Sequence, residues 1–151
     1  MRLDPRRLWL CVPFYAFFLF DLCVTLAGQP PQYWAGNHSA VVEGFPAAAW
    51  ALSKGPWVFA LFCVGWLAAF TLFILALPRF LAETLSLALL IGHAWGAMTW
   101  LAFSARLDYS LCLLFLVAAS ALYVTARGLW QRADAAGRDG VAAGDARPAP
   151  R

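Results

Sequence analysis

Four long runs of apolar residues divide the chain, and most polar residues lie between or beyond them. The runs cover Leu8–Gly28, Pro56–Leu77, Leu81–Ser104 and about residues 109–127. A helix needs about 20 consecutive apolar residues to cross the hydrocarbon core of a bilayer. Because lipid offers no hydrogen-bond partner to the backbone, a spanning segment of this kind must be helical. Each run is therefore predicted to be a transmembrane helix.

The connections between the runs predict how the helices are arranged. Pro78 and Arg79 separate the second and third runs, and Arg106–Asp108 separate the third and fourth. Such short turns place consecutive helices antiparallel to each other. The sequence therefore predicts an all-α polytopic membrane protein, with a four-transmembrane-helix antiparallel bundle in residues 1–130. A long outer loop joins the first two helices.

Composition agrees with this class. Hydrophobic residues make up 63% of the 151-residue chain and charged residues only 13%, whereas soluble domains carry about 25% charged residues. This excludes an ordinary soluble enzyme, a nucleic-acid-binding domain and a disordered regulator. Residues 131–151 are rich in Ala, Gly, Arg, Asp and Pro and contain no aromatic residue, so we expect a disordered cytoplasmic tail there.

The basic residues predict the orientation. Nine of the eleven lie before the first helix, between the second and third, or after the fourth, and only Lys54 and Arg106 lie on the other side. By the positive-inside rule, we expect both termini to be cytoplasmic. Because the Ala- and Arg-rich composition is typical of a bacterial protein, we expect the membrane to be a bacterial inner membrane. An alternative interpretation makes the first helix a cleaved signal peptide, because a basic MRLDPRR segment precedes it and Thr25-Leu26-Ala27 loosely resembles a cleavage site.

Two ionisable residues fall inside predicted spans, where such groups are costly and usually functional. Asp21 lies near the middle of the first helix and His93 at the middle of the third, so they have similar depths. Thr25 follows Asp21 by four residues and shares its face. We expect Asp21 to point into the bundle and to bond His93 or Thr25. This cluster is either a polar contact that holds helices together or a site that handles a proton or a ligand.

The outer loop, Gln29–Gly55, is rich in aromatic residues, and we expect Val41–Leu52 to be ordered and to contain a short helix. His38 and Glu43 are its candidate polar residues. With Asp21 and His93 they would supply zinc-competent ligands, but their spacing matches no metal motif. We therefore predict no metal and no cofactor.

Two further patterns concern helix packing. Gly92 and Gly96 form a G-x-x-x-G pair, which favours close approach of a neighbouring helix. The four cysteines lack C-x-x-C spacing and are interpreted as small apolar residues, with a Cys23–Cys112 bond as the alternative.

Asp21-x-x-x-Thr25 and Val42-Glu43-Gly44-Phe45-Pro46 resemble the pattern of an uncharacterised family of small bacterial four-helix membrane proteins. That family has an Asp and a Thr in its first helix and an acidic residue shortly before an Asn-Pro pair. In this chain, Phe45 takes the place of the asparagine. The resemblance covers about residues 15–80 and implies a fold but no activity.

Three classes of function are compatible with the sequence. The first is a non-enzymatic membrane protein for assembly or interaction, whose partners are the lipid bilayer and a second copy or another membrane protein. The second is a small proton-coupled transporter that uses Asp21. The third is a membrane-embedded hydrolase or transferase at the outer face, which requires Asp21, His38, Glu43 and His93 to converge. The absence of catalytic sequence motifs favours the first class.

Overall fold

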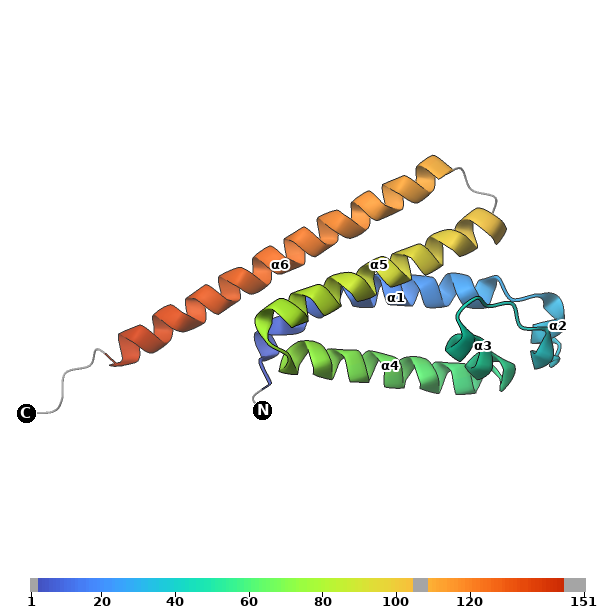
Figure 1. Cartoon of the computed structure of the whole chain (residues 1–151), viewed down its shortest axis with the longest axis horizontal. Coiled ribbons are helices and arrows are strands. Elements are labelled where there is room, and N and C mark those ends of the chain that lie inside the picture. Colours follow the sequence, from blue (N-terminus) through green and yellow to red (C-terminus); the bar gives the residue numbers. More distant parts are fainter. Residues whose placement is uncertain (1–2, 105–108, 146–151) are drawn as a thin grey trace, which may run out of the picture.

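The computed structural model describes residues 3–104 and 109–145, and within these ranges every regular element is a helix (Figure 1). The order is η1 (Pro5–Arg7), α1 (Leu8–Ala27), α2 (Pro31–Trp34), η2 (His38–Ala40), α3 (Pro46–Ser53), α4 (Pro56–Ala76), α5 (Arg79–Ser104) and α6 (Tyr109–Asp145). Over the part described, four helices are long and apolar enough to cross a membrane: α1 with η1, α4, α5 and α6. The prediction of an all-α chain with four such helices is confirmed.

Proline and glycine set the ends of several helices. Pro46 and Pro56 stand at the first positions of α3 and α4, where a missing N–H is tolerated. Gly55 lies between these helices with φ +113°, a conformation that side chains other than glycine rarely adopt. Leu77 is extended because it precedes Pro78. This ends α4 and produces the predicted tight turn into α5.

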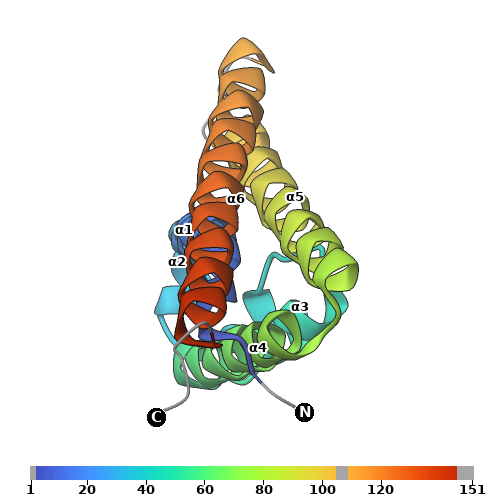
Figure 2. The same ribbon diagram turned by 90° about the vertical axis from the view of Figure 1, so that its left-hand side faces the viewer.

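Helix α1 is the central element. It packs against α4, α5 and α6. Figure 1 shows α1 and α5 lying between α4 and α6, and Figure 2 shows α5 and α6 diverging from the end where they are closest. Leu10 and Phe14 of α1 are fully buried in the main core. Ser86 of α5 is also fully buried, and its hydroxyl donates a 2.6 Å hydrogen bond to the Leu10 carbonyl oxygen. This bond joins α1 and α5 deep in the apolar interior.

Charged side chains meet at the end where α4 turns into α5. The Glu83 carboxylate contacts Arg79 at 3.1 Å, as the four-residue spacing predicted, and also Arg127 of α6 at 2.7 Å. Arg7 donates to the carbonyl oxygens of Ile74 and Leu77 at the end of α4. These contacts join η1 to the end of α4, and α5 to α6, at the same end of the molecule. The second predicted turn, Arg106–Asp108, lies outside the described residues.

The structure differs from the sequence prediction at the C-terminus. Helix α6 continues through Asp145, so residues 131–145 are helical where composition predicted a disordered tail. The segment holds many alanines, the residue with the highest intrinsic helix propensity, and it extends an existing helix without a new nucleus. The division of the chain into a transmembrane domain and a tail remains a prediction.

The outer loop folds over the end of the molecule opposite the turn between α4 and α5, and α3 is the short helix within this loop (Figure 1). Tyr33 is fully buried there, and its hydroxyl donates to the Leu52 carbonyl oxygen at 3.2 Å. Burial raises the pKa of the Tyr33 hydroxyl above its usual value.

Cys23 is a free, exposed thiol. The alternative of a Cys23–Cys112 bond is therefore not observed in the structure.

Candidate functional site

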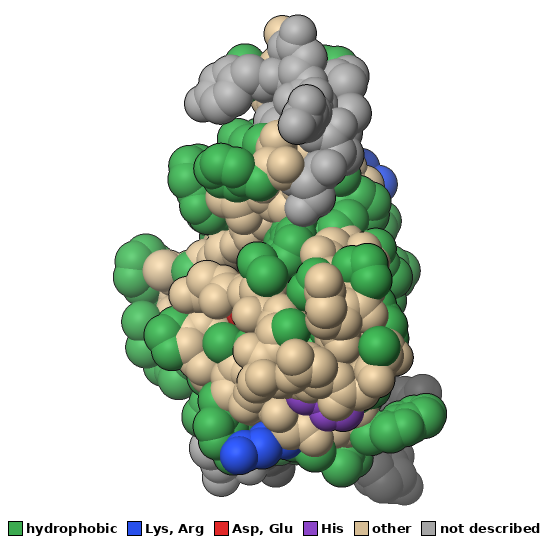
Figure 3. Space-filling model, turned by 90° about the vertical axis from the view of Figure 1, so that its right-hand side faces the viewer, with side chains coloured by type: hydrophobic (Ala, Val, Ile, Leu, Met, Phe, Trp, Pro, Cys, Tyr) green, Lys and Arg blue, Asp and Glu red, His purple; other side chains and the backbone are tan. Residues whose placement is uncertain are grey.

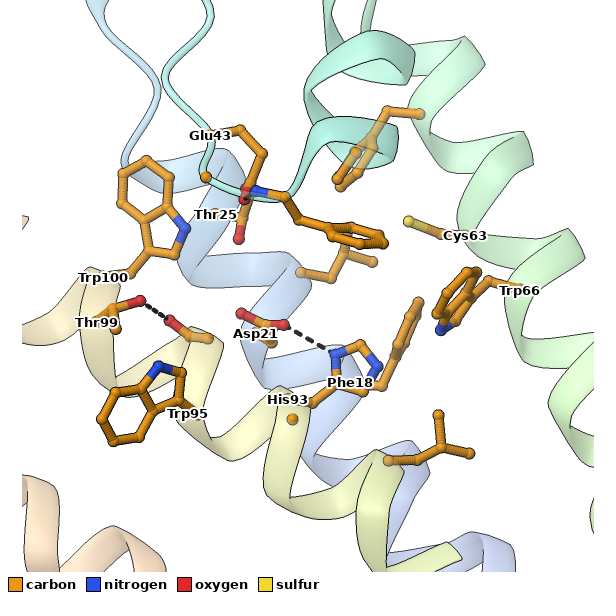
Figure 4. Close-up of a pocket in the computed structure, with 18 of the residues that line it drawn as sticks. Phe18, Asp21, Thr25, Glu43, Cys63, Trp66, His93, Trp95, Thr99 and Trp100 are labelled. Atoms are coloured by element: carbon orange, nitrogen blue, oxygen red, sulfur yellow. Dashed lines mark hydrogen bonds and ion pairs between the residues drawn. The ribbon is translucent and has the colours of Figure 1, made fainter. Parts of the chain in front are cut away.

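A cavity of about 990 Å³ lies between α1, α4 and α5, beneath the loop segment that leads into α3 (Figure 4). Most of its wall is aromatic or aliphatic. Its edge is open, because Trp95 and Phe103 line it and are 61% and 84% exposed. Figure 3 views the molecule from the end that carries the outer loop, where hydrophobic side chains are widespread and acidic ones scarcely visible. The cavity is therefore an apolar space with an opening along the side of the helices.

The Asp21–His93 pair forms the polar centre of this wall. Asp21 Oδ2 of α1 lies 2.9 Å from His93 Nδ1 of α5, and each side chain is 19% exposed (Figure 4). A carboxylate and an unprotonated ring nitrogen can only accept, so this contact requires one proton between the two atoms. The predicted meeting of Asp21 and His93 is present in the structure.

Aromatic rings hold the His93 imidazole in place. Its ring centroid lies 5.6 Å from that of Phe14 and 4.8 Å from that of Phe18, the latter in an edge-on arrangement. Both phenylalanines come from the same face of α1 as Asp21 and are buried. Packing therefore restricts the ring and orients its Nδ1 atom toward the carboxylate.

Glycine on α5 makes room for the carboxylate. A Cβ atom at Gly96 would lie 2.9 Å from both Asp21 oxygens, a distance that real Cβ atoms essentially never show. One turn earlier, a Cβ atom at Gly92 would meet nothing within 4 Å, although Gly92 also lines the cavity. The G-x-x-x-G pair therefore has two roles: Gly96 permits close packing, and Gly92 leaves the cavity open.

Thr25 and Glu43 line the same cavity (Figure 4). Thr25 lies one turn beyond Asp21 and is buried, but within the described residues it makes no hydrogen bond to Asp21 or His93. Glu43 Oε1 accepts a 2.8 Å hydrogen bond from the Phe45 backbone N–H at the start of α3. The cavity thus brings together both segments on which the family resemblance rests.

His38 lies elsewhere. Its ring packs against Tyr33 with a centroid distance of 5.1 Å, and its Cε1 atom lies 3.1 Å from the position of a Cβ atom at Gly55. It does not line the cavity. In the described part of the chain, no three His, Cys, Asp or Glu side chains are close enough together to hold a metal ion. The four-residue convergence that an outer-face enzyme would require is not observed.

Gln29 is a residue that the sequence analysis missed. It is 5% exposed, and its side-chain amide nitrogen donates to the Val42 carbonyl oxygen at 2.8 Å and to the Thr25 carbonyl oxygen at 3.0 Å. Its amide oxygen accepts from the Val42 N–H at 3.0 Å. Gln29 therefore ties the loop before Glu43 to the end of α1. A glutamine that directly follows a spanning helix carries no sequence signal for this role.

Three tryptophans of the cavity were also not predicted as a group. Trp66 comes from α4, and Trp95 and Trp100 come from α5 (Figure 4). Such residues are common in transmembrane helices, and their spacing alone does not reveal a shared space. Comparisons with protein-family models, curated proteins and solved structures found no match to this chain, so its function has to be argued from the site itself.

Proposed function

We propose that the chain is a multi-pass protein of the bacterial inner membrane. In this proposal α1, α4, α5 and α6 cross the bilayer as an antiparallel bundle with both termini in the cytoplasm. The gathering of Arg7, Arg79 and Arg127 at one end of the helices supports this orientation. Lys54 lies at the opposite end, just after α3.

The outward faces of these helices support the membrane location. Large apolar side chains are exposed along α4 and α6, including Leu61 at 73%, Val117 at 64% and Val124 at 69%. An apolar surface this extensive would be a strong aggregation hazard in water but is the normal lipid-contacting surface of a spanning helix.

Topology can be tested with reporter fusions. A reporter that is active only in the periplasm is expected to be active after Asn37 in the outer loop and inactive after Arg138. A cytoplasmic reporter should show the reverse. A periplasmic C-terminus would contradict the proposal. A mature chain that lacks residues 1–27 would contradict four spans and support the signal-peptide alternative.

We further propose that the protein acts without catalysis, as an interaction protein that binds an amphiphilic molecule from the bilayer. The observation that carries this proposal is the lateral cavity with one polar pair in an apolar wall. Ligand sites are typically apolar clefts of up to about 1,000 Å³ with a few convergent polar groups. The exposed edge at Trp95 and Phe103 would admit such a molecule from the surrounding lipid.

A cavity-filling substitution tests this proposal. Gly92→Leu is expected to lower the amount of co-purified amphiphile by at least about tenfold, which corresponds to about 1.4 kcal/mol. The new side chain would occupy the cavity, because nothing lies within 4 Å of the Gly92 Cβ position. The measurement is native mass spectrometry of protein extracted in a mild detergent.

Gly65→Leu is the matched control. Gly65 is a helical glycine of α4 whose Cβ position is equally open, but it does not line the cavity. It should retain the wild-type amount of bound molecule. Equal retention by the two variants would contradict binding in this cavity.

A proton-coupled transporter using Asp21 is the second candidate, and the shared proton of the Asp21–His93 pair favours it. A carboxylate that faces a cavity and can exchange a proton is the minimum requirement for coupling. The two proposals differ in one measurable respect: only a transporter moves the bound molecule across reconstituted vesicles when a proton gradient is applied.

A further inference from the structure

The charged residues around the cavity are unevenly distributed. Asp21 and Glu43 contribute two carboxylates, His93 contributes an imidazole, and no Lys or Arg of the described chain lines the space. Three of the arginines lie instead at the inner end of the helices, where they contact carbonyl oxygens or Glu83. An anionic group in the cavity would therefore face two acidic side chains without a fixed positive partner.

One oxygen of Asp21 is available for a second contact. Its Oδ2 atom is bonded to His93, whereas Oδ1 makes no hydrogen bond within the described residues. When His93 carries only its Nδ1 proton, the pair as a whole keeps the negative charge of the carboxylate. An unneutralised charge in a membrane-embedded wall is costly. A positively charged occupant would offset that cost.

The aromatic residues of the cavity wall also favour a positively charged occupant. Trp66, Trp95 and Trp100 line the cavity together with several phenylalanines. The faces of aromatic rings are electronegative and attract cations, and tryptophan does so most strongly. Aromatic rings also pack well against bulky apolar groups. Carboxylates and indole rings in one apolar space therefore select for a molecule that is both positively charged and hydrophobic.

We propose that the cavity binds a lipophilic organic cation, with its positive centre near Asp21 and its apolar groups against the tryptophans. This inference rests on the proposed binding function and specifies the chemical class of the ligand. It involves no covalent step. Glu43, at the loop side of the cavity, contributes a second negative charge to the wall.

Two probes of nearly the same shape and opposite charge test the inference. The protein in nanodiscs of zwitterionic lipid is dialysed against tetraphenylphosphonium or tetraphenylborate, and binding to empty nanodiscs is subtracted. Tetraphenylphosphonium is expected to bind at least about tenfold more tightly than tetraphenylborate. Because the wild-type chain is used, this comparison does not depend on the folding of a variant.

Substitutions then test which carboxylate attracts the cation. Asp21→Asn keeps the shape and the hydrogen-bonding capacity of the side chain and should weaken tetraphenylphosphonium binding by at least about tenfold. Glu43→Gln should weaken it less, because Glu43 is already bonded to the Phe45 N–H. Asp134→Asn removes a carboxylate of α6 that does not line the cavity and should have no effect.

The outcomes separate this inference from the proposed function. Equal binding of the two probes, or tetraphenylphosphonium binding that is unchanged by Asp21→Asn, would overturn the cation inference and leave a general apolar site. If neither probe binds but Gly92→Leu still removes a co-purified amphiphile, the cation inference also fails while the binding function stands. If neither probe binds and Gly92→Leu has no effect, both proposals fail.

Discussion

Replacing His93 by leucine is expected to destabilise the protein by about 2 kcal/mol. The substitution leaves the Asp21 carboxylate in an apolar wall without its 2.9 Å partner. Removing one member of a fully buried ion pair costs about 3–5 kcal/mol. Here the cost is lower, because each side chain is 19% exposed and polar bonds between transmembrane helices contribute modestly.

A double-mutant cycle separates this charge effect from lost packing. Leucine retains apolar contact with Phe14 and Phe18, so the unpaired carboxylate should account for most of the loss. The Asp21→Leu/His93→Leu variant removes both polar groups and should be more stable than His93→Leu alone. The measurement is reversible unfolding in detergent micelles. A double variant less stable than His93→Leu would show that the pair is not the cause.

Gly96→Ala is the second substitution with a large expected effect. A methyl group there would lie 2.9 Å from both oxygens of Asp21. Either α5 must move away from α1 or the carboxylate must leave its position beside His93. Overpacking of this kind typically costs about 1–3 kcal/mol, and thermal unfolding should show a clear decrease in the melting temperature.

Gly92→Ala is the matched control, since it adds the same methyl group to the same helix one turn away. It meets nothing within 4 Å and should cost no stability. Alanine has the higher helix propensity, so a small gain is expected. Asp21→Ala should make Gly96→Ala nearly neutral, because it removes the atoms that clash. Equal effects of the two glycine substitutions in the wild-type background would contradict this account.

Hydropathy alone was sufficient to identify the four long helices. The four apolar runs correspond to the four long helices, and Pro56 and Pro78 mark the start of α4 and the turn into α5. These features are local, since the length of an apolar run and the geometry of proline act within a few residues. The same local reasoning was wrong for residues 131–145, where a polar, alanine-rich segment continues α6 as a helix.

The Asp21–His93 contact was also predictable from the sequence. Two ionisable residues at similar depths in separate spans have few alternatives to meeting each other. Depth and charge did not predict which loop residue would lie in the same cavity as this pair. Glu43 and His38 were equivalent candidates, yet Glu43 lines the cavity and His38 packs on Tyr33. The difference depends on the two hydrogen bonds that the Gln29 side chain makes with the Val42 backbone, because they position the loop next to Glu43.

The sequence by itself thus determined the helical class, the four apolar spans and the polar pair, because hydropathy and the cost of charge in lipid act on each helix separately. Only the tertiary structure decided that a cavity exists and which residues line it. A cavity depends on the distance between α4 and α5, and the sum of many side-chain contacts sets that distance. Gly92 and Gly96 show the limit: the two residues are identical and one turn apart, yet one faces open space and the other faces Asp21.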